Sequence, residues 1–119
     1  MTALSHLFVH VGDLARSKAF YVDLLGLEVL LEHPGYLRVG GGDGFHLGLE
    51  ERAPDLVGAA GIELVVRVDD VDATVAALRA AGVETTDPDD QEWGARHAWL
   101  RDPDGYRLSV FTPSAEPWS

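Results

Sequence analysis

The sequence repeats itself, and this feature limits the possible folds more than any other. Residues 7–14 (LFVHVGDL) align with residues 64–71 (LVVRVDDV), 57 positions later. Residues 43–49 (DGFHLGL) align with residues 104–110 (DGYRLSV), 61 positions later. Two matches in the same order indicate two copies of one supersecondary unit, because repeats in sequence usually reflect repeats in structure.

Each copy predicts one strand, one helix and three further strands. In the first copy the strands are expected at 6–11, 28–32, 36–39 and 45–50, and the helix at 13–25. In the second copy they are expected at 63–68, 84–86, 96–101 and 106–112, and the helix at 70–81. Asp13 and Asp70 suit helix N-caps, and Gly26 and Gly82 suit the residue after the helix end. The predicted fold class is α+β, with two tandem β-α-β-β-β modules.

The helix ends show where the two copies differ. The N-caps are 57 positions apart, whereas the glycines are 56 apart, so the second helix is one residue shorter. At 119 residues the chain is long enough for one domain. We expect module one at 1–52, a linker at 53–61, module two at 62–113 and a tail at 114–119.

Composition excludes several function classes. The formal net charge of −11 makes nucleic acid a poor partner, because phosphate backbones would be repelled. No apolar run approaches the roughly 20 residues of a membrane span, so no membrane partner is expected. The first residues lack the pattern of a secretory signal, which predicts a cytoplasmic location. Cysteine is absent, which excludes disulfides and thiolate chemistry.

The predicted strands present two different faces, because successive side chains of a strand alternate. In the first strand Leu7, Val9 and Val11 are expected to face the helix, and His6 lies on the opposite, mixed face. A face that is partly apolar and partly polar is typical of small-molecule pockets. Aromatic rings there would stack on flat ligands, and polar groups would donate or accept hydrogen bonds. The candidate ligand-binding residues are His6, Phe8, His10, Tyr36, Arg38, His46, Glu63, Arg67, Trp93, His97, Trp99, Ser109 and Phe111.

Three segments together resemble the vicinal oxygen chelate superfamily. They are HLFVHVGDLARSKAFYVDLLGLE (6–28), VDDVDATVAALRAAGVE (68–84) and DPDGYRLSV (102–110). This superfamily includes glyoxalase I, bleomycin-resistance proteins, fosfomycin-resistance enzymes and extradiol dioxygenases. The resemblance implies a cupped eight-stranded mixed sheet whose cavity is usually completed in a homodimer.

The resemblance also implies four positions for ligands of a divalent metal, and they fall on His6, Gly48, Glu63 and Ser109. His6 and Glu63 bind metals well, but the other two do not, whereas catalytic sites usually need three protein ligands. The set therefore resembles that of the metal-free, antibiotic-binding members. We expect a binding protein without cofactor or catalytic residue, which confers resistance by sequestering an aromatic or cationic natural product in a dimer cavity.

Two alternatives remain open. The first is a metal-dependent lyase, isomerase or thiol transferase in which His6 and Glu63 are ligands. Its third ligand would come from His46, Glu50 or the partner chain. The second is metal-free acid–base chemistry by the pair His6 and Glu63, because a histidine beside a carboxylate transfers protons near neutral pH.

Overall fold

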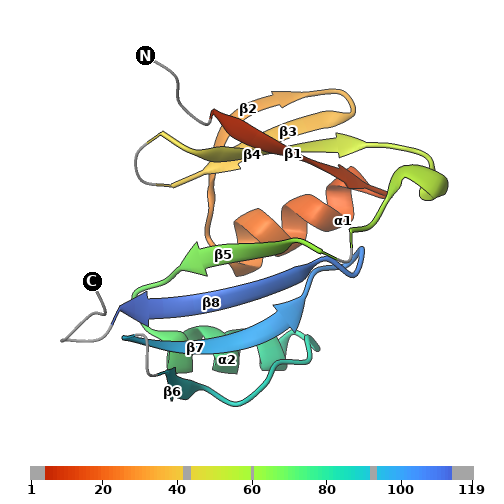
Figure 1. The fold of residues 1–119 in the computed structure, drawn as a ribbon. Helices are drawn as coiled ribbons and strands as arrows, with labels where there is room; N and C mark the ends of the chain where they lie inside the picture. The colour runs from red at the N-terminus through yellow and green to blue at the C-terminus, as the bar shows by residue number, and fades with distance from the viewer. Residues whose placement is uncertain (1–4, 42–43, 60, 92–93, 114–119) are drawn as a thin grey trace. The chain divides into compact units, whose positions relative to one another are not determined.

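The structure, a computed structural model, describes residues 5–41, 44–59, 61–91 and 94–113. The chain divides into two compact units, residues 1–58 and 59–119. Each unit contains one four-stranded mixed sheet with a helix packed on it, which confirms the predicted α+β fold of two modules (Figure 1). That the two units form one domain stays a prediction. No helix of the described residues is long and apolar enough to cross a membrane.

The first unit contains sheet A, in which β1 pairs with β4 in parallel and the other pairs are antiparallel. The strands, in spatial order, are β1 (His6–Val11), β4 (His46–Glu51), β3 (Tyr36–Gly40) and β2 (Glu28–His33). A short 3₁₀ helix, η2 (Pro54–Leu56), follows β4 within the predicted linker. The observed strand bounds lie within one residue of the predicted bounds.

The second unit contains sheet B, which has the same order and strand directions as sheet A. Its elements are β5 (Glu63–Arg67), β8 (Arg107–Pro113), β7 (Ala95–Arg101), β6 (Asp89–Gln91) and the helix α2 (Val71–Ala80). The predicted strand at 84–86 is wrong, since Thr85 forms only an isolated bridge with Leu100. Arg79 explains this, because its guanidinium binds the Thr85 carbonyl at 3.1 Å and Asp87 at 2.8 Å. The paired strand β6 begins only at Asp89.

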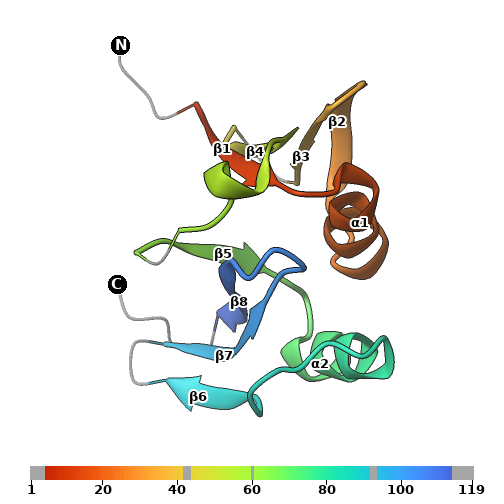
Figure 2. The same ribbon diagram turned by 90° about the vertical axis from the view of Figure 1, so that its right-hand side faces the viewer.

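Each sheet buries one face against its own helix, as Figures 1 and 2 show. In sheet A the buried side chains are those of Val9, Val11, Leu37, Val39 and Leu49. In sheet B they are those of Leu64, Ala98, Leu100, Leu108 and Val110, packed against Val71, Val75 and Leu78 of α2. The alternation of strand side chains then leaves the opposite face of each sheet without a helix.

The first helix lies within the predicted range 13–25, but it is not a single α-helix. An α-helical turn, α1 (Leu14–Lys18), continues into a π-helical segment, η1 (Ala19–Leu24). The N–H of Leu25 donates to the carbonyl of Phe20, five residues back. A π turn accommodates one residue more than an α turn. The π segment therefore absorbs the extra residue of module one, while both helices keep an aspartate N-cap and a glycine after the end.

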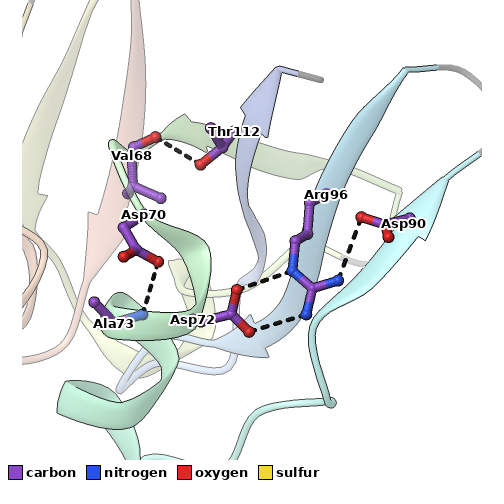
Figure 3. A network of polar contacts seen from close by, with 7 residues as sticks. All are labelled: Val68, Asp70, Asp72, Ala73, Asp90, Arg96 and Thr112. Carbon is purple, nitrogen blue, oxygen red and sulfur yellow. Dashed lines mark hydrogen bonds and ion pairs between the residues drawn. The ribbon is translucent and has the colours of Figure 1, made fainter. Parts of the chain in front are cut away.

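An ion-pair network fixes α2 to sheet B (Figure 3). The guanidinium of Arg96 on β7 binds both carboxylate oxygens of Asp72 on α2 at 2.9 Å, and Asp90 on β6 at 3.3 Å. The hydrogen bond to Arg96 lowers the pKa of the Asp72 carboxyl, and the same bond raises the pKa of Arg96. Asp70 caps α2 by accepting from the Ala73 N–H at 3.1 Å. These contacts lie on the helix side of the sheet and leave its other face open.

Candidate functional site

We call the face of each sheet that points away from its helix the helix-free face. Strand pairing places the predicted residues of the first unit on this face of sheet A. His6 pairs with His46, and Phe8 pairs with Gly48. Arg38 pairs with Gly48 from the other side. The remaining members in this unit are His10, Glu50 and Tyr36.

Two histidines stack at one end of this face. The rings of His6 and His46 are nearly parallel, with centroids 4.9 Å apart and an interplanar angle of 5°. Nδ1 of His6 lies 2.8 Å from the hydroxyl of Ser5. Nε2 of His46 is buried and has no hydrogen-bond partner within the part of the chain that the structure describes.

The centre of the face is closed by aromatic rings. A Cβ atom at Gly48 would lie 2.8 Å from Cδ1 of Phe8 and 2.7 Å from Oη of Tyr36. Real side chains do not approach so closely, so these two residues occupy the space that a side chain at position 48 would need. Arg38 Nε donates to the same Tyr36 hydroxyl at 3.2 Å.

The other end of the face carries a charged group. Nε2 of His10 lies 3.7 Å from Oε1 of Glu50, and Glu50 also forms an ion pair with Arg52. Nδ1 of His10 lies 3.3 Å from the carbonyl oxygen of Leu56. The carboxylate of Glu50 therefore has a permanently charged partner within its own unit.

The helix-free face of sheet B has a different composition. Val65 and Trp99 flank Ser109 in one row across the sheet, and Phe111 lies between Arg67 and His97 in the next. On the other side of the Ser109 row, Arg107 lies between Glu63 and Arg101. Arg107 Nη2 is 3.5 Å from Oε1 of Glu63.

Trp99 is the main aromatic surface of this face, with 43% of the residue exposed. Its backbone is fixed, because its N–H donates to the Thr86 hydroxyl at 2.8 Å and its carbonyl accepts from the Thr86 N–H at 2.9 Å. The ring of His97 is buried and lies 4.4 Å from the indole, centroid to centroid. The backbone hydrogen bonds and the contact with His97 therefore hold Trp99 in place while part of the residue remains exposed.

The structure brings the predicted residues together in two groups, one on each sheet. His6, Phe8, His10, Tyr36, Arg38 and His46 share the helix-free face of sheet A. Glu63, Arg67, His97, Trp99, Ser109 and Phe111 share that of sheet B. Trp93 and the tail lie outside the described residues. The ligand-binding roles of these residues stay predictions.

Arg101 and Arg107, which lie opposite each other on sheet B, are not among the predicted site residues. A signal for them was present. The two arginines flank the Asp-Pro-Asp-Gly turn at 102–105, and the strands on either side of such a turn pair antiparallel. Counting outward from the turn would have placed both arginines on one face.

Comparison with known proteins places this geometry in a family. Residues 3–110 match the Glyoxalase/Bleomycin resistance protein/Dioxygenase superfamily. The chain belongs to this superfamily.

Relatives within the superfamily have different functions. The lactoylglutathione lyase of Haemophilus influenzae is 32% identical over an alignment 117 positions long, which covers 87% of this chain and 87% of that one. The crystal structure of TnmS3, an antibiotic binding protein from Streptomyces sp. CB03234, is 32% identical, with a TM-score of 0.79 over 96% of this chain and 98% of that one. A glyoxalase/bleomycin resistance protein from the same strain is 34% identical, with a TM-score of 0.71 over 90% and 98%.

The four positions to which the resemblance assigns metal ligands differ in the donor groups that they offer. His6 and Glu63 offer a nitrogen and a carboxylate. Gly48 offers no donor, and Ser109 is a buried hydroxyl-bearing residue. Within the described residues no group of three or more histidines, cysteines or acidic residues is arranged to hold a metal ion.

Proposed function

We propose that this protein binds a small aromatic molecule on its helix-free faces and releases it chemically unchanged, with no metal or other cofactor. The observation that carries the proposal is the exposure of large apolar side chains among polar ones. Phe8 is 53% exposed, Val65 59% and Trp99 43%. Exposed apolar groups that cluster with polar side chains mark binding surfaces. The antibiotic-binding relative TnmS3 supports this reading.

The physiological role that fits such binding is antibiotic resistance by sequestration. A protein that holds a toxic compound stoichiometrically lowers its free concentration without any reaction. We include in the proposal a homodimer, in which two copies share the ligand, and a cytoplasmic location. Analytical ultracentrifugation tests the first of these, because a monomer that binds the ligand at full affinity would contradict a shared site.

The geometry of the first unit supports binding without metal. Imidazole nitrogens coordinate with lone pairs that lie in the ring plane, at about 2.0–2.1 Å for zinc. The rings of His6 and His46 are nearly parallel. Their lone pairs therefore do not converge on one ion between them, so His46 does not supply the missing ligand in this arrangement.

The position of Gly48 supports the same conclusion. In this chain the rings of Phe8 and Tyr36 fill the space of a side chain there. The residues present in this unit thus do not fit a divalent metal site, and no reaction step is assigned to one.

The test combines metal analysis with ligand recovery. Tag-free protein is dialysed without chelator and analysed by elemental mass spectrometry. It is then titrated with a panel of aromatic antibiotics by tryptophan fluorescence, with and without EDTA, and the bound compound is recovered for mass spectrometry. We expect binding that EDTA does not change and a recovered compound of unaltered mass. A stoichiometric divalent metal with an altered product would contradict the proposal.

A second candidate function rests on the lactoylglutathione lyase relatives. It requires a divalent metal held by His6 and Glu63 and a third ligand not yet identified. The hemithioacetal of methylglyoxal and glutathione is the discriminating substrate. Metal-dependent formation of the thioester, lost in His6→Ala and in Glu63→Ala, would establish this candidate in place of the first.

A further inference from the structure

The helix-free face of sheet B carries more basic than acidic residues. Three of the chain's nine lysine and arginine residues, Arg67, Arg101 and Arg107, lie there. The acidic residues of the same face are Glu63 and Asp89, so the face has a formal charge of +1 on a chain whose net charge is −11. The acidity of the protein is therefore located elsewhere, and this face attracts anions relative to the rest.

The basic residues on the helix side of the sheets have close carboxylate partners, unlike those on the helix-free face of sheet B. Lys18, Arg79 and Arg96 each pair with a carboxylate at 2.8–2.9 Å. On the helix-free face, Arg107 has only the longer contact of 3.5 Å with Glu63. Arg101 donates to the carbonyl of Gly105 at 2.9 Å and has no carboxylate partner among the described residues.

Arg101 and Arg107 are direct cross-strand partners in the antiparallel pair of β7 and β8. Like charges directly opposite each other destabilise a sheet, because the side chains are only about 4.5–5.5 Å apart at Cβ. An anion between the two guanidinium groups would relieve this repulsion. Each guanidinium has five N–H donors, and the contacts above use one of them in each residue, so donors remain for a ligand.

Trp99 lies next to this pair. It is two residues before Arg101 on β7, so both side chains point to the same face about 7 Å apart. Ser109, which pairs with Trp99, is a small buried residue, and Trp99 and the two arginines beside it remain more exposed. The contact with Gly105, in the turn that follows β7, holds the Arg101 guanidinium at the end of the strand.

We infer that this face recognises an aromatic carboxylic acid. The carboxylate accepts hydrogen bonds from Arg101 and Arg107, and the ring stacks on Trp99. Guanidinium groups match carboxylates in shape and bind them with charge-assisted hydrogen bonds. Glu63 lies on the far side of Arg107 from Arg101 and does not occupy the space between them. The assignment rests on the proposed function and specifies its ligand class, since it excludes a cationic ligand from this face.

The experiment uses two probes of the same shape, 2-naphthoate and the uncharged 2-naphthamide, in isothermal titration calorimetry with full-length protein at low salt. We expect the acid to bind about 10-fold more tightly than the amide, because hydrogen bonds to a charged group are stronger. The double variant Arg101→Gln/Arg107→Gln should lose this preference and bind the amide as before. Arg16→Gln, an exposed arginine on α1, is the control and should keep the preference.

The outcomes separate this inference from the proposed function. Equal affinities for acid and amide would overturn the inference and leave sequestration standing. Preferential binding followed by conversion of the acid would keep the inference and overturn sequestration. Absence of binding of either probe below about 1 mM would overturn the inference. Thermal unfolding of each variant provides a folding check, and the single variants Arg101→Gln and Arg107→Gln replace the double variant if it is unfolded.

Discussion

The two modules have the same strand order and strand directions, yet their helix-free faces differ at the centre. In sheet A the central residue is Gly48, and Phe8 and Tyr36 lie over it. In sheet B the equivalent residue is Ser109, with Trp99 exposed beside it and arginines beyond. The first face carries three histidines, and the second carries three arginines. The two modules therefore share a scaffold but differ in the chemistry of their helix-free faces.

The helices differ for a related reason. Both begin after an aspartate cap and end before a glycine, but the first contains one residue more. The extra residue is accommodated in the π segment η1, between the aspartate cap and the glycine. A π turn can therefore accommodate one residue more within the same helix.

The largest effect is expected from deleting one residue in each helix. Ala19 and Ala76 are both exposed and both lie six residues after the N-cap. Deleting Ala76 rotates the rest of α2 by about 100°. This removes Leu78 from the core and should cost about 2–5 kcal/mol. Deleting Ala19 should cost less, because the π turn becomes an α turn. Urea unfolding measures both, and equal losses would contradict this account of η1.

The next largest effect is expected on ligand affinity, and it tests which of the two helix-free faces binds 2-naphthoate. Trp99→Ala should weaken binding of 2-naphthoate by about 10-fold, because a stacked aromatic pair contributes about 0.5–1.5 kcal/mol beyond the area that it buries. Phe8→Ala should change this affinity less than 2-fold, because Phe8 lies on sheet A, whereas the arginines inferred to bind the carboxylate lie on sheet B. Calorimetry on both variants checks the difference. The reverse order would place the ligand on sheet A.

A smaller effect tests the closed centre of sheet A. Gly48→Ala should cost about 1 kcal/mol in the free energy of unfolding, because the new methyl group displaces Phe8 and Tyr36. The same substitution in a Phe8→Ala background should cost less, which a double-mutant cycle detects. Ser109→Ala on sheet B provides the matched control. A Gly48→Ala cost that does not depend on Phe8 would argue against the packing described here.

The smallest effect concerns pH and the helix anchor of the second unit. The pKa of Asp72 is lowered by its hydrogen bond to Arg96. The stabilisation is therefore complete above the ordinary carboxyl pKa of about 3.9 and is lost as the pH falls through the lowered folded value. The difference in Tm between the wild type and Asp72→Asn should be present at pH 7 and close in acid. Glu32→Gln removes the carboxylate that pairs with Lys18, and it is therefore the matched control for loss of an ion pair in the first unit.

Much of the fold could be predicted because the repeat and the strand alternation are local signals. The N-caps Asp13 and Asp70 and the strand from His6 to Val11 were recovered from residue types alone. The misplaced strand at 84–86 and the π segment could not be recovered in this way. The first depends on the contact of Arg79 with the Thr85 carbonyl, and the second on how an extra residue is accommodated.

The candidate site was predicted by face but not by contact. Alternation placed Phe8, His10 and Trp99 on the correct side of their strands. It gave no information on the stack of His6 and His46, which depends on the register of β1 against β4. The charge imbalance of sheet B was also missed, because it appears only when side chains from separate strands are assigned to one surface.

The most direct test of the central claim is an NMR titration of ¹⁵N-labelled protein with 2-naphthoate. We expect shift changes at the Trp99 indole N–H and at backbone amides of β7 and β8, including Arg101, Arg107 and Ser109. The ligand resonances should be unchanged after incubation. Shift changes confined to β1 and β4, or new resonances from a converted ligand, would contradict the claim.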